Sequence, residues 1–453
     1  MTRRAALAFL GCQALASCTF IPKLKMPDSP VSTRFPGGSK TSAGSSEIGW
    51  RQVFNDVRLV RLIEIALANN RDLRVAMLRV EEARAQYRIE RSALLPSVSG
   101  SAAVTRSHSG GLTTEQSSLN VGTTSYELDL FGRIRSLSAK ALQQYLAKTE
   151  AQRAVQVTLI AQLATQYYTV RQLDELIANT KLTLAAVEES YRLNESIFKA
   201  GALLELDLRS SEAQVLTAKA NLIAYQRQRE QAENGLVLML GQPMPTDLPA
   251  GKSLADAPVK SISAGVPSEL LQGRPDILEA EHNLRAANAD IGAARAAFFP
   301  SIKLTALEGT ASAELGSLFS KGTAAWSFAP QITLPIFTGG RNKANLDAAK
   351  IRTRIEVSNY EKAIQSAFRE VADALAAQKA AKEQIGTLQV LVTAQQRRYD
   401  LAAARDQRGV SSYLNVVTSQ QDLFAAQQNL ISARYDAVAA RIKLYQAVGG
   451  GWK

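Results

Sequence analysis

The sequence predicts a mixed α+β membrane protein that is mostly helical and contains an internal duplication. Three observations lead to this fold class. A series of motifs occurs twice along the chain, two proline-free stretches carry apolar residues at heptad spacing, and each copy of the motifs contains two strand-like segments. Long coiled-coil hairpins joined to short membrane strands account for all three.

The duplication is the strongest of these signals. Motifs in the first half of the chain recur in the same order in the second half, with a spacing that drifts by only a few residues. The matched pairs are Asp72-Leu73-Arg74-Val75-Ala76 with Asp276-Ile277-Leu278-Glu279-Ala280, Leu95-Pro96-Ser97 with Phe299-Pro300-Ser301, Leu130-Phe131 with Ile336-Phe337, and Gly201 and Gly241 with Gly409 and Gly449. We therefore expect two structural repeats, 57–241 and 274–449, followed by a tail at 450–453. Two copies are too few for a solenoid, so they indicate pseudosymmetry inside a larger ring.

Each repeat is expected to begin with a helix, at 57–94 and at 275–298. Pro96 and Pro300 end these helices, because proline lacks an amide proton and disfavours helix at the residue before it. The run Asn69-Asn70-Arg71-Asp72 is a candidate irregularity in the first helix.

Two strand-like stretches follow in each repeat, with Ser/Thr/Gly-rich surface loops between them. Their expected ranges are 97–108, 118–131, 301–311 and 325–337. Period-two alternation is clearest in Tyr126-Glu127-Leu128-Asp129-Leu130 and in Ile302-Lys303-Leu304-Thr305-Ala306-Leu307.

A proline-free helical stretch comes next in each repeat, at 133–200 and at 341–408. Apolar residues recur every seven positions, which is typical of a supercoiled seam: Leu163, Val170, Ile177, Leu184, Tyr191 and Phe198 in the first repeat, and Ile385, Val392 and Tyr399 in the second. Gly201 and Gly409 interrupt the seam, and a return helix follows, marked in the second repeat by Phe424, Ile431, Val438 and Tyr445. Each repeat is therefore expected to end in a long helical hairpin with its glycine at the tip. A plain helix C-cap is the other role open to both glycines.

The N-terminus has the features of a bacterial lipoprotein signal. Arg3 and Arg4 precede an apolar run that is too short to span a membrane. The run ends in Leu15-Ala16-Ser17-Cys18, which matches the lipobox pattern in which the cysteine is acylated. We expect residues 1–17 to be the signal peptide and Cys18 to carry the lipid. Cys12 fits the pattern less well, and an unmodified Cys18 within an apolar leader is the alternative.

Two segments outside the repeats are expected to be irregular. Within residues 18–56, the stretch 19–46 is rich in Pro, Ser and Gly and is expected to run as an extended strap from the lipid anchor. The 242–273 connection between the repeats contains five prolines, which exclude regular helix over most of its length.

The four strand-like stretches match the nine to eleven residues that a tilted membrane strand needs. Closed membrane barrels contain eight strands or more, so four strands from one chain cannot close. Several chains must therefore share a barrel. A dimer would supply eight strands and a trimer twelve, and the strand count alone leaves both open.

The composition argues against catalysis, metal binding and nucleic-acid binding. Both cysteines lie within the first 18 residues, and the two histidines, His108 and His282, are far apart, so neither residue type indicates a metal site. The net charge of +12 comes from interleaved charges, which favours a solvated surface over a nucleic-acid-binding patch. Gly251-Lys252-Ser253 resembles the end of a phosphate-binding loop, but Thr246 stands where that motif requires a glycine. We expect no catalytic residue, no cofactor and no metal, and hence no enzyme.

Six blocks of the chain resemble the TolC-type outer membrane factor family, and most closely its acylated drug-efflux (OprM-like, NodT) lipoprotein branch. The blocks are Ala68-Asn69-Asn70-Arg71-Asp72-Leu73, Glu127-Leu128-Asp129-Leu130-Phe131-Gly132-Arg133, Gly273-Arg274-Pro275-Asp276-Ile277-Leu278, Ala294-Arg295-Ala296-Ala297-Phe298-Phe299-Pro300-Ser301, Leu334-Pro335-Ile336-Phe337 and Gly449-Gly450-Gly451-Trp452. The resemblance implies a homotrimer with a twelve-stranded transmembrane β-barrel, four strands per chain, continued by a long periplasmic α-helical barrel. It also implies an equatorial belt, to which 18–56 and 242–273 would contribute.

The resemblance further implies a function and partners. The chain would be the outer-membrane channel of a tripartite multidrug efflux pump, in contact with outer-membrane lipid, anchored at Cys18 and extending into the periplasm. It would act as a passive conduit that opens when a periplasmic adapter (membrane fusion) protein and an inner-membrane RND pump dock.

Two groups of site residues follow from the same resemblance. Gly201, Ala202, Leu203, Gly409 and Val410 would be the adapter-docking tips, and Asp207, Leu414, Asn415 and Thr418 would narrow the periplasmic gate. Relatives often have Asp where Asn415 or Thr418 stands, so an apolar constriction at Leu414 is the alternative to an acidic ring. For Asp207 the alternative is a favourable charge at a helix N-terminus.

Other functions are less favoured. A type I protein-secretion duct or a metal-efflux duct would share the same plan, and the lipobox and the six blocks favour drug efflux over both. A periplasmic coiled-coil scaffold without a pore would be expected to show one hairpin rather than two hairpins and four strands.

Overall fold

The computed structural model describes residues 19–35, 49–256, 259–260, 262, 267, 271, 273–410 and 412–451. Contacts divide the chain into two compact units. The strand unit comprises the described residues within 1–28, 77–150 and 278–362, and the hairpin unit comprises those within 29–76, 151–277 and 363–453.

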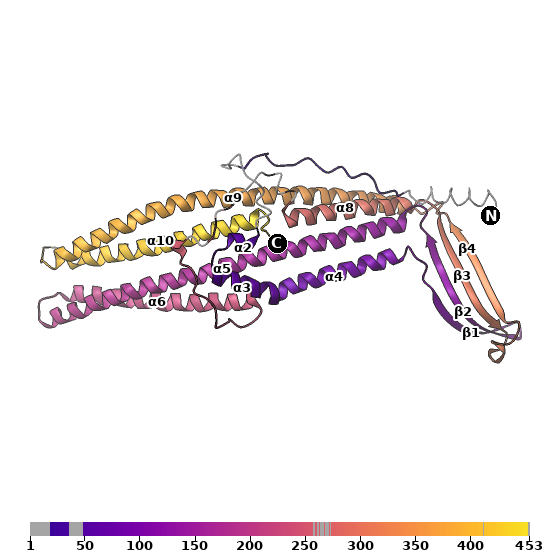
Figure 1. The fold of residues 1–453 in the computed structure, drawn as a ribbon, viewed down its shortest axis with the longest axis horizontal. Helices are drawn as coiled ribbons and strands as arrows, with labels where there is room; N and C mark the ends of the chain where they lie inside the picture. Colours follow the sequence, from indigo (N-terminus) through magenta and orange to yellow (C-terminus); the bar gives the residue numbers. More distant parts are fainter. Residues whose placement is uncertain are drawn as a thin grey trace. The chain divides into compact units, whose positions relative to one another are not determined.

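The same order of elements occurs twice along the chain (Figure 1). The first series is α4 (Arg71–Ser92), β1 (Ser99–Ser109), β2 (Leu112–Leu128), α5 (Arg133–Lys199) and α6 (Glu205–Leu240). The second is α8 (Pro275–Ala296), β3 (Ser301–Ser312), β4 (Ala324–Thr333), α9 (Arg341–Asp406) and α10 (Tyr413–Ala447). The remaining elements are α2 (Trp50–Val53), α3 (Val57–Asn69) and the short 3-10 turns η2 (Leu254–Asp256) and η3 (Leu315–Ser317).

The helix expected at 57–94 is broken at Asn70, which confirms the irregularity predicted there. Asn70 has extended backbone, and its side-chain oxygen accepts from the Leu73 amide at 2.9 Å, so it caps the start of α4. Its side-chain nitrogen donates to the Met239 carbonyl at 2.8 Å, near the end of α6. One side chain thus begins one helix and satisfies a terminal carbonyl of another.

Arg274 makes the equivalent connection in the second series. It is 6% exposed and donates to the Ala447 carbonyl at the end of α10, at 2.6 Å. Its guanidinium also pairs with the carboxylates of Asp276 and Glu370, at 2.6 and 2.8 Å. The start of α8 is therefore tied to the end of α10, as the start of α4 is tied to the end of α6.

The four strands form one antiparallel sheet in the order β1-β2-β3-β4. The sequence prediction was wrong about the start of β2, which begins at Leu112 rather than at 118. The Ser/Thr/Gly-rich stretch expected as a loop pairs with β1 instead, and only Gly110-Gly111 turns, with φ of 62° and 84°. The last strand ends at Thr333, short of the predicted 337.

The two faces of this sheet differ in polarity, and the register assigns residues to them because directly paired residues point to the same side. We define the apolar face by its apolar residues across the strands, namely Ala102, Val104, Leu119, Val121, Tyr126, Leu128, Ile302, Leu304, Ala306, Trp326, Phe328 and Ile332. Polar residues on the same face include Arg106, Glu115, Ser117, Thr123, Glu308 and Thr310. The opposite, polar face carries Ser99, Ser101, Thr105, Gln116, Ser118, Asn120, Glu127, Lys303, Thr305, Ser327 and Gln331. Several apolar-face side chains are highly exposed, Trp326 at 80% and Ile332 at 68%.

A bulge in β2 keeps this segregation intact. The register shifts between Thr123 and Tyr126, and Ser125 adopts a positive φ of 57° while its amide donates to the Thr305 hydroxyl. The extra residue restores the alternation so that Tyr126 and Leu128, rather than Glu127, lie on the apolar face.

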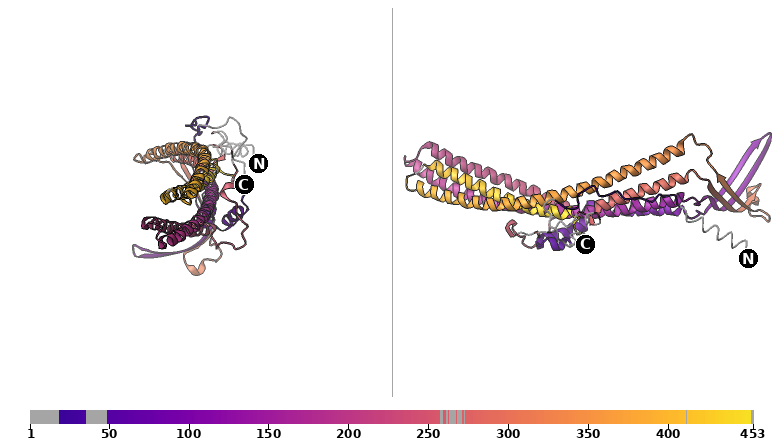
Figure 2. Two further views of the ribbon diagram at one scale, coloured as in Figure 1. Left: turned by 90° about the vertical axis from the view of Figure 1, so that its left-hand side faces the viewer. Right: turned by 90° about the horizontal axis from the view of Figure 1, so that it is seen from above.

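The hairpin unit contains two helical hairpins. Hairpin 1 consists of α6 and the part of α5 that follows residue 150, and hairpin 2 consists of α10 and the part of α9 that follows residue 362. The two hairpins lie side by side (Figure 1; Figure 2). Their base packs on a core that includes Trp50, Phe54, Leu59, Ile63, Tyr168 and Tyr445. Asp56, fully buried, caps α3 and accepts hydrogen bonds from the Tyr167 hydroxyl and the Lys252 amide, both at 2.8 Å. It thereby fastens the Pro-rich connection to α3 and α5.

The heptad seam of α5 is only partly the core of the hairpin. Leu163 and Val170 are buried, but Ile177, Leu184 and Tyr191 are half-buried and Phe198 is 37% exposed. The deepest positions lie three residues further along: Leu173, Thr180, Val187 and Asn194. A heptad stripe needs two positions per repeat, and the second stripe was missed in the sequence because Thr180 and Asn194 are polar.

None of the described helices is long and apolar enough to cross a membrane.

Candidate functional site

Both predicted tips are closed by the same backbone motif. Gly201 has φ of 76°, its amide donates to the Phe198 carbonyl, and the next amide donates to the Ile197 carbonyl. Gly409 has φ of 70°, and its amide and the next one donate to the carbonyls of Asp406 and Arg405. This pattern is the Schellman C-cap, so the helix-capping role of both glycines is confirmed. A Cβ at either glycine would meet nothing within 4 Å, so the tips are open to solvent.

The tips present apolar side chains to solvent. Gly201, Ala202, Gly409 and Val410 are exposed, whereas Leu203 is half-buried. Leu204 and Leu206, which are not among the predicted docking residues, are 71% and 74% exposed. Exposed apolar groups on neighbouring hairpins are typical of an interaction surface.

The four predicted gate residues lie at the starts of the two return helices. Asp207 is in the first turn of α6 with Glu205, where a negative charge stabilises the helix N-terminus. Leu414, Asn415 and Thr418 lie in the first turns of α10, and Leu414 is 61% exposed. The Thr418 hydroxyl donates to the Leu414 carbonyl at 2.9 Å.

Asp406 and Tyr413 complete this cluster and were missed in the sequence. Burial, and then the carboxylate of Asp207, raise the pKa of Asp406 above its ordinary value of 3.8. Burial raises the pKa of Tyr413 as well, and the nearby groups that act on it include Asn194, Asp406, Tyr399 and Asp207. Two carboxylates from different hairpins therefore interact at the tips. Their separation of about 200 residues in sequence leaves no local signal of this proximity.

A second candidate region lies in the strand unit, where residues 20–22 of the N-terminal segment pack against the protein. We call these contacts the seat of the N-terminal segment. The ring of Phe20 stacks on Phe299 at 4.7 Å, and Phe299 stacks on Phe131 at 5.0 Å. The backbone beside Phe20 is held too, because the Asn288 amide donates to the Pro22 carbonyl at 2.8 Å. A Cβ at Gly292 would lie 2.9 Å from the Ile21 nitrogen, so that glycine permits the close approach. Cys18 itself lies outside the described residues.

The strand–helix junction beside this seat is built from ion pairs. Arg133 binds Glu127 through two nitrogens, at 2.8 and 2.7 Å. Asp129 caps α5 by accepting from the Ile134 and Arg135 amides, and it also pairs with the Arg135 guanidinium at 3.0 Å. These contacts fix how the chain leaves β2 and begins α5.

Among the described residues, no group of three or more His, Cys, Asp or Glu side chains is placed to hold a metal ion. His282 hydrogen bonds to Gln143 at 2.7 Å, and His108 to Thr113 at 2.9 Å.

Comparisons with known proteins agree on one family. The family model for the outer membrane efflux protein matches residues 62–242 and 266–450. The chain is 44% identical to a probable efflux pump outer membrane protein, TtgC of Pseudomonas putida, over 97% of this chain and 93% of the relative. It is 40% identical to outer membrane protein OprJ of Pseudomonas aeruginosa, over 98% and 95% of the two chains. The open state of the MtrE outer membrane channel of Neisseria gonorrhoeae superposes with a TM-score of 0.90 at 41% identity, covering 96% of this chain and 99% of that one.

The carboxylates at the tips predict a dependence on pH. A carboxyl group with a raised pKa keeps its proton to higher pH in the folded arrangement, so that arrangement is stabilised as the pH falls and weakened as the pH rises through that pKa. Backbone amide hydrogen exchange at the tips, corrected for intrinsic rates, is expected to become slower as the pH is lowered from about 7 to about 4. Asp406→Asn is expected to slow exchange at neutral pH and to flatten the pH response. Asp400→Asn on the same helix, whose carboxylate accepts from Gln396, is the control. A full pH response in Asp406→Asn would contradict the assignment.

Proposed function

Because the chain belongs to the outer membrane efflux protein family, we propose that it forms the outer-membrane exit channel of a tripartite, RND-type multidrug efflux pump. The observation that carries this proposal is a sheet with one apolar and one polar face, joined through long helices to two hairpins with exposed tips. Relatives are named as efflux pump outer membrane proteins for toluene, solvents and antibiotics. The chain acts as a passive conduit without chemistry of its own.

The sheet supports a barrel shared between copies. Its strands are 10 to 17 residues long, enough to cross a bilayer when tilted. In the described residues β1 and β4 are the outer strands, and each leaves one edge unpaired. We propose that β4 of one copy pairs with β1 of the next, which gives twelve strands in a homotrimer. The apolar face then meets outer-membrane lipid and the polar face lines the conduit.

The helices support the continuation of the tube into the periplasm. Ile177, Leu184 and Tyr191 on α5 are half-buried within one chain, which leaves apolar surface for neighbouring helices. We propose that copies pack along this stripe to form an α-helical barrel, as in a coiled coil with more than two strands.

Two equivalent hydrogen bonds, each joining the start of one helix to the end of another, support an internal duplication. Asn70 binds the end of α6, and Arg274 binds the end of α10, at positions that align between the repeats 57–241 and 274–449. The 242–273 connection is attached at Lys252 by Asp56 and at Val259 by Arg441, which supports its role as an equatorial belt. Residues 450–453 form the tail.

Residues 1–17 are proposed to be the signal peptide, and Cys18 is proposed to carry the lipid anchor. The seat of Phe20 against Phe299 and Phe131 supports this, since it holds residue 20 next to the bases of the membrane strands. From there Cys18 is two residues away, so its acyl chains would enter the adjacent leaflet. Residues 18–56 form the strap and the equatorial segment that follow the anchor, and the equatorial segment includes α2.

The hairpin tips are the proposed contact with the other two components. The adapter docks on Gly201, Ala202, Leu203, Gly409 and Val410, and the exposed Leu204 and Leu206 extend that surface. Asp207, Leu414, Asn415 and Thr418 form the periplasmic gate. Docking of the adapter and of an inner-membrane RND pump opens it.

Imaging of the detergent-extracted outer-membrane fraction tests the proposed assembly. We expect long particles with three-fold symmetry and a mass of about three chains, because four strands per chain close only when copies combine. A monomer or a dimeric rod would remove the shared barrel and with it the channel.

Weakening the proposed gate is expected to make cells leak. Leu414→Gly removes an exposed apolar side chain at the mouth, so uptake of a large antibiotic that normally fails to cross the outer membrane should rise several-fold. Leu238→Gly is the matched control. This leucine is 80% exposed and lies near the C-terminal end of α6, the end away from the hairpin tip. Equal uptake in both variants would contradict the gate assignment at Leu414.

The lipid anchor is tested by metabolic labelling. Palmitate label is expected on the wild-type chain and on Cys12→Ser, and it is expected to disappear from Cys18→Ser, since only a cysteine at the lipobox is acylated. Label that persists on Cys18→Ser would show that Cys18 is not the modified residue.

A further inference from the structure

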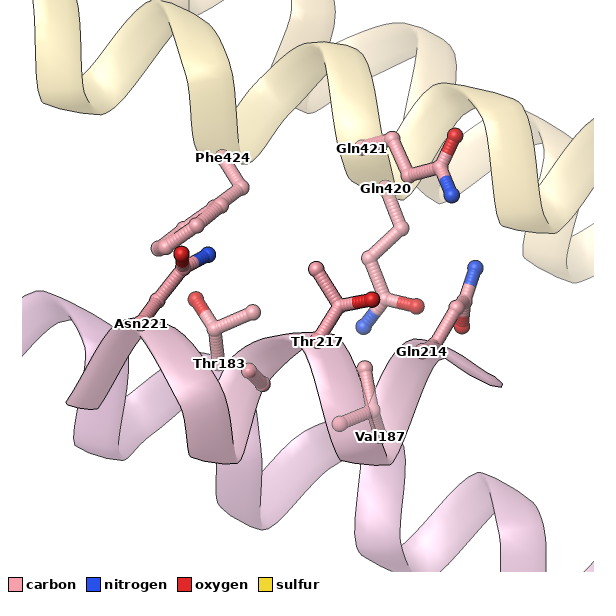
Figure 3. Close-up of a pocket in the computed structure, with 9 residues that line it drawn as sticks. Thr183, Val187, Gln214, Thr217, Asn221, Gln420, Gln421 and Phe424 are labelled. Atoms are coloured by element: carbon pink, nitrogen blue, oxygen red, sulfur yellow. The ribbon is translucent and has the colours of Figure 1, made fainter. Parts of the chain in front are cut away.

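Two hollows in the described residues differ in the charge of their walls. One, of about 50 Å³, lies between the hairpins and is lined by uncharged side chains, among them Gln214, Thr217 and Phe424 (Figure 3). The other, of about 400 Å³, lies in the strand unit, where the bases of β2, β3 and β4 meet the ends of α5, α8 and α9. Its charged lining residues are Glu127, Asp129, Arg133, Lys303 and Arg341. Of the two, only the hollow of the strand unit can attract a charged ligand.

This hollow lies at the base of the polar face of the sheet. Glu127 is paired with Lys303 across β2 and β3, and Ser301 is paired with Thr333 across β3 and β4. Directly paired residues point to the same side of a sheet, and all four of these residues line the hollow. In the proposed channel the polar face is the wall of the conduit, so the hollow is open to solutes that pass through it.

Both carboxylates of the hollow are already paired within the chain. Glu127 accepts hydrogen bonds from two nitrogens of Arg133, at 2.8 and 2.7 Å. Asp129 accepts from two backbone amides at the start of α5 and pairs with the Arg135 guanidinium at 3.0 Å. Neither carboxylate is therefore free to neutralise another cation.

Lys303 and Arg341 are the uncompensated charges of the hollow. Among the residues that the structure describes, neither of them forms an ion pair, and both are exposed. With Glu127 and Asp129 each bound to an arginine, the wall of the hollow carries an excess of positive charge. An anion that enters the hollow is therefore attracted by two cations with no internal competitor.

The first repeat shows which group such an arginine binds. Arg133 is the first residue of α5, and Arg341 is the first residue of α9. The alignment of the repeats places Thr333 where the first repeat has Glu127, the carboxylate that binds Arg133. The second repeat thus has the arginine without the carboxylate, and a carboxylate from outside the chain fits the same geometry.

The starts of the two helices differ in the same way. Pro335 stands in the second repeat where the first has Asp129, which caps α5. In the described part of the chain, no side chain accepts from the amides of Asn342 and Lys343 at the start of α9. The positive end of this helix adds to the attraction that Arg341 and Lys303 already provide.

The remaining wall of the hollow suits an apolar group. Phe131, Phe299 and Pro300 line it, and its volume of about 400 Å³ lies within the range of roughly 300–1,000 Å³ that is typical of small-molecule sites. We propose that the hollow binds an amphipathic carboxylate, with the carboxylate on Arg341 and Lys303 and the apolar part against Phe299 and Pro300. This role rests on the proposed function, because the ligand is a solute in transit through the conduit. Exposed ion pairs bind weakly, so the solute is held briefly and released.

Block of single-channel current by 2-naphthoate tests the site in the assembled protein. Arg341→Gln removes one of the two cations, and Thr333→Glu supplies Arg341 with the carboxylate that the first repeat has. Each is expected to raise the half-blocking concentration about fivefold, the upper range for an exposed ion pair. Arg354→Gln, at an exposed position on α9 outside the hollow, is the matched control and is expected to leave block unchanged. Conductance without ligand reports that each variant is folded and assembled.

Two further measurements locate the ligand and identify its source. In crystals soaked with 6-bromo-2-naphthoate, an anomalous bromine peak is expected in the hollow of the wild type and not in Thr333→Glu. The neutral isostere 2-naphthylmethanol is expected to block weakly, and equally in the wild type and Arg341→Gln. Lipid phosphorus that co-purifies with the wild type and is lost from Arg341→Gln would assign the site to a lipid headgroup and overturn the solute.

The outcomes separate this proposal from the proposed function. A wild-type protein that forms no channel refutes the proposed function, and the bromine peak still decides whether the hollow binds a carboxylate. A wild-type channel that 2-naphthoate blocks equally in Arg341→Gln, Thr333→Glu and Arg354→Gln overturns the carboxylate site alone.

Discussion

Backbone amides and carbonyls along the outer edges of β1 and β4 have no strand beside them in the described residues, and the apolar face of the same sheet has no core to cover it. In water both features promote aggregation, and in hydrocarbon each unpaired backbone group costs several kcal/mol. The proposed ring of copies would remove both problems at once, since it would pair every edge and turn the apolar face to lipid. The bulge at Ser125 serves this arrangement, because it keeps Tyr126 and Leu128 on the apolar face to the end of the strand.

The helices also leave apolar surface for the neighbouring copies that we propose. The deep stripe of α5, from Leu173 to Asn194, is buried within the chain, whereas Ile177, Leu184 and Tyr191 are only half-buried. A chain built this way has apolar surface left over in the sheet and along the hairpins. Ion pairs such as Arg229 with Asp174 and Arg398 with Asp422 join the two helices of each hairpin. Between the hairpins, the described residues include hydrogen bonds of neutral groups, such as Tyr225 with Gln428, and the interacting carboxylates of Asp406 and Asp207 at the tips. The fold thus combines braced hairpins with a contact that can shift. That combination suits a mouth that must open without the hairpins unfolding.

Local chemistry explains which parts of the fold the sequence could predict. The helix boundaries were predicted to within a few residues because Pro96, Gly201, Pro300 and Gly409 act on the backbone beside them. The start of β2 was missed because residues 113–118 are polar on both faces, so the apolar–polar alternation that marks a half-buried strand is absent there. Thr180 and Asn194 concealed the second heptad stripe in the same way. The proximity of Asp406 to Asp207 depends on packing between hairpins, which no local pattern encodes.

The junction between β2 and α5 connects these features at one level of the strand unit. Ion pairs such as Arg133 with Glu127 and Arg135 with Asp129 would be costly in hydrocarbon, so they mark where the apolar face must end. Phe131 lies between Asp129 and Arg133 in sequence, and it belongs to the aromatic stack that seats Phe20. The segment that follows the proposed lipid anchor is therefore held at the same boundary that the ion pairs define. If Cys18 carries the proposed lipid, its acyl chain would enter the membrane beside the strands, and the anchor and the sheet would then fix the same depth.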